Sequence, residues 1–446
     1  MVRPSIALRP FLDLGAFPSP LSARDAARRL LLRLVGLPWS QAPCDGRDLA
    51  RPCDWDYFLS LGARHRVAPV LHARLAALRQ AQGGPEHGRR AEGALEDAVP
   101  ERVREALAGY HATTLTRNVL LLSETESFCE RLHRHGIPVM LLKGVALLPL
   151  DRLGAVSMVE PQGVYPHPAL RPMTDVDILI HKRDVPAARR ILESECGYRD
   201  AGIESPAGER VYGRTTLHKP DAPGRLGRVL LEVHWDIVPL EYEWKGRRPP
   251  TAEFWAGANE VRLGEAPAFA PNDADHLCYI AMHNCVHGFD RLMGLMDVAY
   301  LYCRLRRSSS WDPLVRCATT YRCRVDLFLN LALAQGLFGV PCAPAALQEL
   351  APAEWRARLL ARLFTPEAIF DEKFSPVRRC LIRALSADHL GDALRLLVWS
   401  VFPSETWLAH KAELGKIPGA RNRWLGHLVS LAGHARDAVR SMRRGR

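Results

Sequence analysis

The sequence has few of the features that mark a secreted or membrane-spanning protein. It contains 11 cysteines, an odd number with no C-x-x-C pair, which argues against both a disulfide framework and a zinc ribbon. No apolar run approaches the roughly 18 residues of a membrane span, and the longest candidates, residues 139–148 and 396–402, are short or interrupted by Lys143. Arg9 and Asp13 interrupt the apolar residues near the N-terminus, so this segment lacks the continuous apolar stretch of a secretory signal. The sequence therefore predicts a cytoplasmic protein without a membrane span.

Lysine is also scarce, since it supplies only seven of the 60 basic residues. The net charge of +11 permits an anionic partner such as a nucleotide, nucleic acid or membrane surface, but it identifies none. With 48% hydrophobic and 24% charged residues, the chain is expected to fold, which excludes wholesale disorder and fibrous repeats. A length of 446 residues suggests two to four structural units.

Hydrophobic periodicity divides the chain into three predicted regions. Residues 1–125 are expected to form a mainly helical N-terminal region, residues 126–245 a mixed core, and residues 246–446 a helical C-terminal domain with a basic tail. The expected helical segments are 54–78 (as a pair), 101–135, 185–195, 273–286, 289–305, 311–337, 352–363 and 377–397, with an exposed linker at 80–96. The tail, residues 435–446, is interpreted as a solvated helix in preference to a nucleic-acid or lipid contact.

The central region shows the patterns of β-strands. Short apolar or alternating runs predict strands at residues 137–142 and 174–180, and a further pair at 210–218 and 228–237. Asp184 is expected to cap the helix between these two groups of strands. The fold class predicted for the whole chain is therefore α+β, with a small mixed sheet flanked by helices.

Asp175 and Asp177 lie two residues apart on the second predicted strand, so both side chains should point to the same face. Two neighbouring carboxylates repel, and a divalent cation relieves that repulsion. Mg²⁺ suits such a place because it prefers oxygen ligands and keeps positions open for substrate phosphates. The pair alone is weak evidence, since D-x-D triplets are common at strand ends.

Two further elements strengthen this interpretation. Lys143 and Gly144 directly follow the first strand and open a helical segment, where free backbone N–H groups favour a phosphate and glycine permits its close approach. Glu232 lies inside an otherwise apolar strand, where a buried carboxylate needs a cation or hydrogen bonds, and His234 falls on the same face. The alternative for Lys143 and Gly144 is an ordinary strand-to-helix turn without a ligand.

This ordered series resembles the nucleotidyltransferase fold superfamily, and more closely an uncharacterised bacterial nucleotidyltransferase family in which Lys-Gly replaces the usual Gly-Ser. The matching segments are LLKGVALL (141–148), RPMTDVDILI (171–180), Gly197-Tyr198, LEVHW (231–235), HNCVHGFDRLMGLMDVAYL (283–301) and RHRVAPVLHARL (64–75). The likeness covers roughly residues 54–305.

The resemblance implies a Mg²⁺-dependent transfer of NMP from an NTP, with Mn²⁺ as a possible substitute, to a hydroxyl of an unidentified acceptor. It implies that Asp175, Asp177 and Glu232 bind the metal and carry the catalysis. It further implies that Lys143 and Gly144 contact the nucleotide phosphates.

Other polar side chains have weaker claims to the site. Arg171 precedes the second strand, and the sequence leaves open whether it contacts a phosphate or forms a structural salt bridge. His283 and His287 have the i, i+4 spacing of a zincin, but Asn284 stands where that motif needs Glu, so structural hydrogen bonding or a substrate-side role is favoured over metal binding. His234, Arg291 and Asp297 are further candidates, the last two as an ion pair or as nucleotide contacts.

Three hypotheses remain open from the sequence. The first is a nucleotidyltransferase, the second a non-catalytic nucleotide- or RNA-binding module of the same fold, and the third a toxin-like transferase that modifies tRNA or protein. The acceptor could be a small molecule, a peptide, a protein or RNA, because its pocket is expected in helical regions that carry no motif.

Overall fold

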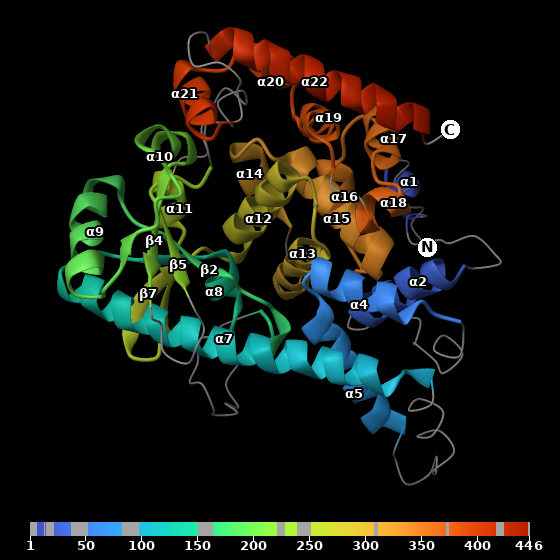
Figure 1. Cartoon of the computed structure of the whole chain (residues 1–446), viewed down its shortest axis with the longest axis horizontal. Coiled ribbons are helices and arrows are strands. Elements are labelled where there is room, and N and C mark those ends of the chain that lie inside the picture. The colour runs from blue at the N-terminus through green and yellow to red at the C-terminus, as the bar shows by residue number, and fades with distance from the viewer. Residues whose placement is uncertain are drawn as a thin grey trace.

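The computed structural model contains a seven-stranded mixed sheet in the order β3-β4-β5-β2-β1-β7-β6, which lies to one side of a bundle of helices (Figure 1). The structure describes residues 7–12, 14, 22–36, 52–82, 98–149, 164–220, 228–238, 251–306, 311–371, 374–415 and 423–444. The strands are β1 (Met140–Leu142), β2 (Asp175–Leu179), β3 (Arg199–Asp200), β4 (Arg214–Lys219), β5 (Val229–His234), β6 (Asn259–Leu263) and β7 (Ala266–Ala270). The α+β class predicted from the sequence is confirmed.

Helices precede the sheet along the chain and also intervene between its strands. They are α1 (Arg9–Leu12), α2 (Ala23–Gly36), α4 (Trp55–Arg64), α5 (Ala68–Gln82), α7 (Glu101–Arg134), α8 (Lys143–Leu147), α9 (Val185–Ser194), α10 (Pro206–Tyr212) and α11 (Thr251–Ala256). The long α7 contacts β2, β6 and β7 and extends past the sheet to α5 (Figure 1). Gly136 has the left-handed φ expected just after this helix.

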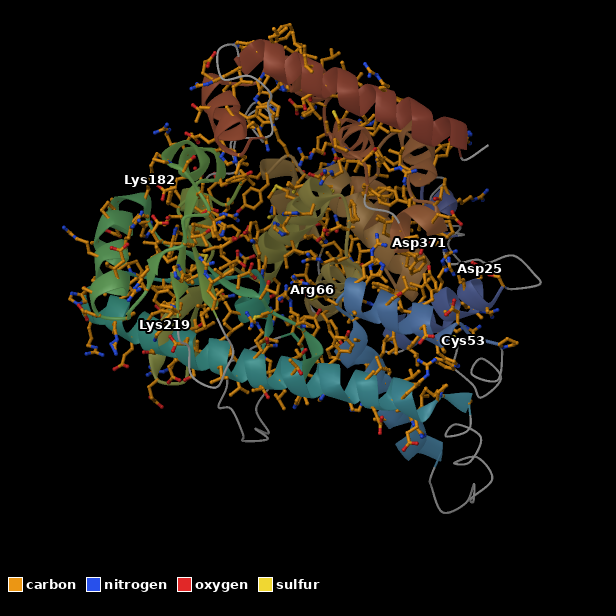
Figure 2. The ribbon with its side chains drawn as sticks, viewed as in Figure 1. Asp25, Cys53, Arg66, Lys182, Lys219 and Asp371 are labelled. Atoms are coloured by element: carbon orange, nitrogen blue, oxygen red, sulfur yellow. The ribbon has the colours of Figure 1, made fainter. Side chains whose placement is uncertain are left out.

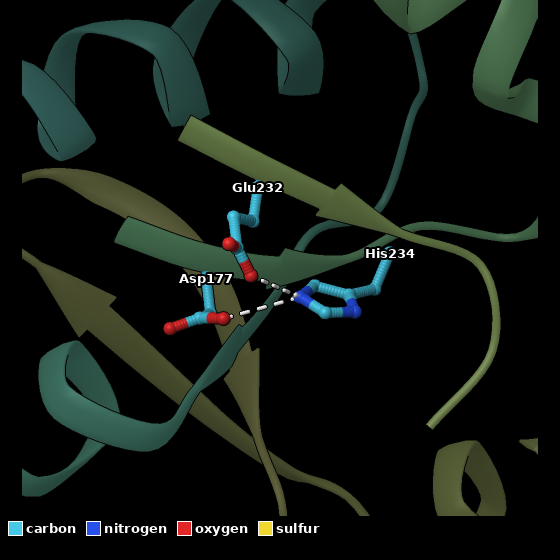
Figure 3. A group of neighbouring side chains, drawn as sticks. All are labelled: Asp177, Glu232 and His234. Atoms are coloured by element: carbon cyan, nitrogen blue, oxygen red, sulfur yellow. Dashed lines mark hydrogen bonds and ion pairs between the residues drawn. The ribbon is translucent and has the colours of Figure 1, made fainter. Parts of the chain in front are cut away.

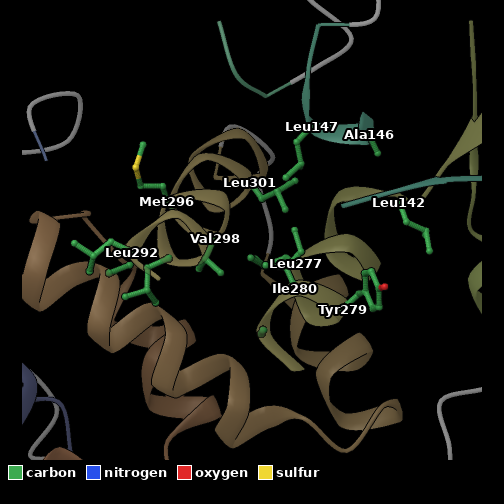
Figure 4. Close-up of a cluster of buried hydrophobic side chains, with 14 of the residues drawn as sticks. Leu142, Ala146, Leu147, Leu277, Tyr279, Ile280, Leu292, Met296, Val298 and Leu301 are labelled. Atoms are coloured by element: carbon green, nitrogen blue, oxygen red, sulfur yellow. The ribbon is translucent and has the colours of Figure 1, made fainter. Parts of the chain in front are cut away.

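The C-terminal half is a helical bundle. Its helices are α12 (Asp273–His287), α13 (Leu292–Leu305), α14 (Asp312–Thr320), α15 (Arg324–Phe338), α16 (Pro344–Leu350), α17 (Glu354–Arg362), α18 (Pro366–Phe370), α19 (Pro376–Ser386), α20 (Leu390–Val401), α21 (Glu405–Glu413) and α22 (Arg423–Arg444). Buried side chains of α12 and α13, among them Leu277 and Leu301, lie near Leu142 and Leu147 (Figure 4). One continuous hydrophobic core thus joins the sheet to the bundle.

Several local expectations need correction. The segment after Thr251 is not wholly helical, because the β6–β7 hairpin pairs in parallel with β1 and extends the sheet. Residues 210–212 belong to α10, whose N-terminus is capped by Ser205, so the predicted strand begins only at Arg214. Asp184 precedes α9 but makes no side-chain capping hydrogen bond.

Two predicted long helices are each divided in two. Residues 311–337 form α14 and α15, because Arg322 takes a left-handed φ of 51° between them. Residues 377–397 form α19 and α20, because Asp388 leaves the helix and accepts hydrogen bonds from the backbone N–H groups of Arg324 and Val325. Asp388 thereby caps α15, a long-range role that periodicity does not reveal.

The remaining organisational predictions have mixed outcomes. The paired helices at 54–78 are confirmed as α4 and α5, while most of the predicted linker at 80–96 lies outside the described residues. The basic tail is helical to Arg444, and most of its side chains are likewise outside the description. The division into three regions stays a prediction. No helix of the described residues is long and apolar enough to cross a membrane.

Candidate functional site

Strand pairing brings Asp177 and Glu232 together. β2 and β5 run in parallel with Asp177 directly opposite Glu232, so their side chains lie on the same face of the sheet. His234 follows two residues later on that face, and its Nε2 lies 3.1 Å from Asp177 Oδ1 and 3.3 Å from Glu232 Oε2 (Figure 3). One potential ligand atom from each of these residues lies within 4.8 Å of the others. We call Asp177, Glu232 and His234 the acidic cluster.

Lys143 occupies the same space as a cation would. Its Nζ donates to Asp177 Oδ1 at 2.5 Å and lies 4.0 Å from Glu232 Oε2. Burial disfavours the ammonium, but the carboxylates of Asp177 and Glu232 outweigh that penalty, so the pKa of Lys143 is raised. The sequence predicted this residue beside the nucleotide phosphates, whereas its partner in the structure is a carboxylate.

The backbone at Lys143 is also unusual. Its φ is 44°, in the left-handed region that costs a residue with a Cβ about 1–2 kcal/mol. Such strain persists only where the surroundings enforce it, and it concentrates at functional sites. Because the register pairs Leu142 with Asp177, the next residue emerges at the end of β1 beside the acidic cluster. The strained backbone therefore directs the lysine toward the carboxylates.

The two aspartates differ in their environments. Burial would raise the pKa of Asp177, but Lys143 and His234 hold it well below its usual value. Asp175 is partly exposed, and burial followed by the charges of Asp177 and Glu232 raises its pKa. Asp177, in contrast, is only 6% exposed. Asp175 thus has the greater affinity for a proton.

Arg214 is a site residue that the sequence did not reveal. Its Nη1 donates to Glu232 Oε2 at 2.5 Å. Burial disfavours the charge of the guanidinium, and the carboxylates of Glu232 and Glu204 offset that penalty. Arg214 stands at the start of β4, opposite His234 in the antiparallel register. The alternation of side chains along β4 could have placed Arg214 on the face of the sheet that carries Glu232. That inference needs the first residue of the strand, which the sequence did not give.

Arg171 takes the structural role that the sequence left open. Its Nε and Nη2 donate to Asp297 Oδ1 and Oδ2 at 2.8 and 2.7 Å, and Tyr165 also donates to Asp297 Oδ1 at 2.7 Å. Asp297 therefore pairs with Arg171, and the alternative of an Arg291–Asp297 ion pair is not what the structure contains. The bidentate pair ties the segment before β2 to α13.

Gly144 is held close to this pair. A Cβ at Gly144 would lie 2.3 Å from Arg171 Nη1 and 2.8 Å from Met173 Sδ. Packing alone therefore excludes a side chain at this position, and the phosphate contact expected from the sequence stays a prediction.

His283 and His287 lie one turn apart on α12 with ring centroids 4.4 Å apart. Burial, reinforced by the charge of Lys143, lowers the pKa of His283 well below its usual value and that of His287 to about 4. Both imidazoles are therefore neutral near pH 7. Within the described residues, the group with metal-ligand spacing is the acidic cluster, and neither histidine belongs to it.

Two adjoining cavities open around these residues. The smaller, of about 360 Å³, is bordered by Asp175, Asp177, Glu232, Gly144, Arg66 and Arg291. The larger, of about 550 Å³, is bordered by His234 and by helices of the C-terminal bundle. Lys143, Arg214, His283 and His287 border both cavities. Helix α12, which carries His283 and His287, thus faces the same cleft as the carboxylates.

A comparison with protein families identifies the chain's relatives. A family model described as uncharacterised nucleotidyltransferase matches residues 51–339, which is more than half of the chain. The chain belongs to this nucleotidyltransferase family. No curated protein and no solved structure matches it. The family recognised from the sequence is thereby confirmed, and all candidate site residues fall within the matched segment, whereas α19, α20 and α21 lie beyond it.

Proposed function

We propose that this protein is a Mg²⁺-dependent nucleotidyltransferase that transfers an NMP from an NTP to an acceptor hydroxyl and releases pyrophosphate. The proposal is carried by one observation. Asp177 and Glu232 meet on adjacent parallel strands beside the Lys143-Gly144 turn, in a chain that belongs to a nucleotidyltransferase family. Membership supports nucleotidyl transfer in general, and the metal, the nucleotide and the residue roles are our proposal.

The acidic cluster fits a divalent cation in its donor chemistry. Asp177 and Glu232 offer the carboxylate oxygens that Mg²⁺ and Mn²⁺ prefer, and His234 offers a nitrogen that Mn²⁺ also accepts. Asp175 would complete the set from the same face of β2. The fit requires the Lys143 ammonium to leave Asp177, since both cations would use the same oxygen.

The nucleotide phosphates supply that alternative partner for Lys143. In the smaller cavity, Lys143, Arg66 and Arg291 would hold the triphosphate, and the lysine would move from a carboxylate to a phosphate oxygen. A bound metal would neutralise charge on the phosphates and on the leaving pyrophosphate. Asp175 would accept the proton of the attacking hydroxyl.

A specific observation also favours the alternative of a nucleotide-binding module. Lys143 and Arg214 already neutralise Asp177 and Glu232, so the site is electrostatically satisfied without a metal. If the lysine never leaves, the carboxylates serve only to position it, and nucleotide binds without turnover.

The decisive experiment uses each α-³²P-labelled NTP with Mg²⁺ or Mn²⁺ and the low-mass and macromolecular fractions of a cell extract. We expect label transfer with pyrophosphate release, both absent in Asp175→Asn. A nucleotide-dependent rise in melting temperature without transfer to any fraction would favour the binding module. If no NTP changes the melting temperature, both functions are wrong, because ligand at a hundredfold excess over its Kd should stabilise the protein by about 2.7 kcal/mol.

A further inference from the structure

The larger cavity shares a wall with the proposed catalytic site. Lys143, Arg214, His283 and His287 separate it from the smaller cavity, so a molecule within it would lie next to the acidic cluster. Its volume of about 550 Å³ falls in the range of pockets that enclose small molecules. An NTP in the smaller cavity and a second molecule in the larger one would thus meet across this shared wall.

The far wall of the larger cavity is rich in positive charge. Arg379 and Arg383 lie one turn apart on α19, and Lys411 comes from α21. Among the described residues that border this cavity, Asp236 alone carries a carboxylate. Cationic side chains therefore outnumber anionic ones, even when Lys143 and Arg214 are left out because they pair with the acidic cluster. Charge complementarity therefore favours an anionic occupant.

Arg379 is placed to bind such an anion. Its stem packs against Gly288, where a Cβ would approach the Arg379 Cγ to 2.7 Å. In the part of the chain that the structure describes, its guanidinium makes no hydrogen bond or ion pair, and the side chain borders the cavity. Arg383 on the next turn is anchored by a hydrogen bond of 2.9 Å from its Nη2 to the Val286 carbonyl. The two guanidiniums offer the forked donors that phosphate and carboxylate groups prefer.

Apolar side chains form another part of the lining, beside polar ones such as Tyr212 and Ser400. Ile237 and Val238 follow β5, Met282 lies on α12, and Leu396 and Trp399 belong to α20. These side chains can pack against an apolar or aromatic portion of a bound molecule.

We propose that the larger cavity binds the acceptor, and that the acceptor is a small molecule with a hydroxyl, an oxyanion group and an apolar or aromatic portion. This inference rests on the proposed nucleotidyltransferase function. The acceptor oxygen forms a bond to the NTP α-phosphorus, the bond from that phosphorus to the bridging oxygen breaks, and pyrophosphate leaves with the electron pair. The hydroxyl proton passes to the Asp175 carboxylate. The part of this cavity's wall that α19–α21 supply lies outside residues 51–339, the segment that the family model matches.

A binding experiment tests the cavity without requiring turnover. The probes are 1-naphthyl phosphate, 1-naphthoate and uncharged 1-naphthol, titrated calorimetrically into the full-length protein. We expect at least one anionic probe to bind at least about tenfold more tightly than naphthol and to remain bound at saturating Mg²⁺ and ATP, with the two anions distinguishing a phosphate from a carboxylate preference. Arg379→Gln should weaken anion binding about tenfold, whereas its neighbour Arg378→Gln, outside the cavity lining, should not.

Several results would overturn the inference while leaving the proposed function intact. These are equal binding of naphthol and the anions, binding that is insensitive to Arg379→Gln, or displacement of the anions by ATP. Arg379→Gln is preferred to Arg383→Gln because Arg383 also bonds to α12 and its loss could disturb folding. Thermal melts verify that each variant is folded.

The transfer assay provides the second arm. With α-³²P-labelled NTP and a panel of hydroxy-phosphates, hydroxy-acids and neutral alcohols, we expect transfer to anionic members, with Arg379→Gln raising the acceptor KM about tenfold and changing kcat little. Label that enters only RNA or protein would overturn the small-molecule acceptor but not the transferase. Absence of any transfer, with anion binding intact, would instead overturn the proposed function and the acceptor role with it.

Discussion

At the scale of single residues, the buried pair of Lys143 and Asp177 determines how the site responds to substitution. Lys143 Nζ lies 2.5 Å from Asp177 Oδ1, and both side chains are largely buried. Removing one partner of a buried pair leaves the other charge uncompensated, at a cost of about 3–5 kcal/mol. Neutralising an aspartate should therefore leave the fold unaffected at Asp175, which is partly exposed, but not at Asp177.

Asp175→Asn and Asp177→Asn should both abolish nucleotide transfer. We expect the rate to fall by at least about 100-fold, since even changes around the ligands of a metal cost about 10–100-fold. Asp177→Asn should also lower the free energy of unfolding by about 3–5 kcal/mol, whereas Asp175→Asn should change it little. Labelled transfer and urea unfolding measure the two effects. Retention of activity within a few-fold in either variant would show that the metal site is wrongly assigned.

Lys143→Met should change metal and nucleotide binding in opposite directions. The ammonium and a metal compete for Asp177, so its removal should tighten Mn²⁺ binding in the absence of nucleotide, while ATP binding should weaken about tenfold. Electron paramagnetic resonance of Mn²⁺ and calorimetry with ATP measure these affinities. Lys182→Met is the matched control, because Lys182 is exposed, lies away from Arg66 (Figure 2) and borders neither cavity. Unchanged Mn²⁺ affinity in Lys143→Met would contradict the competition.

At the scale of elements, the turn between β1 and α8 is fixed by contacts distant in the sequence. Gly144 packs against Arg171, which Asp297 of α13 holds in a bidentate pair. Asn118 of α7 also donates to the carbonyls of Pro168 and Arg171 at 2.6 and 2.8 Å. A helix and a buried ion pair thereby position the two segments that bring Lys143 and Asp175 to the site.

Gly144→Ala should therefore destabilise the fold even where no nucleotide is present. The new Cβ would lie 2.3 Å from Arg171 Nη1, and the guanidinium cannot move without disturbing its buried pair with Asp297. We expect the free energy of unfolding to fall by about 1–3 kcal/mol, as for other overpacked sites. Gly109→Ala on α7 is the control, since a Cβ there meets nothing within 4 Å. Equal stability of the two variants would mean that Arg171 is not held as rigidly as the structure indicates.

At the scale of the whole molecule, buried neutral histidines should make stability fall in mild acid. Burial lowers the pKa of His65 and His287 to about 4 and that of His276 to about 3, against about 6.5 in an unfolded chain. Between about pH 6.5 and pH 4 the unfolded state therefore binds more protons, so their contribution is complete above pH 6.5 and is lost as the pH falls. Asp177, whose pKa is depressed, extends this loss below its unfolded pKa of about 3.9.

Urea unfolding at pH 7.5, 6.0 and 5.0 should reveal this loss as a falling free energy of unfolding. His276→Leu should flatten the profile, because it removes one buried titrating imidazole whose Nε2 has no hydrogen-bond partner in the described part of the protein. A change of one pKa unit corresponds to about 1.4 kcal/mol at most. A pH profile of the variant as steep as that of the parent would assign the acid sensitivity to other groups.

The sequence determined the features that depend on neighbouring residues. Periodicity placed the strands near 137–142 and 174–180 and the helix ending before Gly136, and the ordered Lys-Gly, D-x-D and E-x-H residues indicated the family that the family model confirms. These signals are local, because side-chain direction repeats every two residues in a strand and every 3.6 in a helix. Proximity of Asp177 and Glu232 could also be anticipated, since the resemblance implies it.

Only the tertiary structure decided which charges pair. Arg171 meets Asp297 across 126 residues, Lys143 meets Asp177 across 34, and Arg214 reaches Glu232 through the register of β4 and β5. The division of α19 from α20 likewise depends on Asp388 capping a helix about 64 residues earlier. Such pairings depend on how elements pack, and the hydrophobic pattern that forms each element carries no information about which cation will face which carboxylate. For the same physical reason, the sequence could not predict the cationic cavity, because residues of α19–α21 and residues that follow β5 line it together.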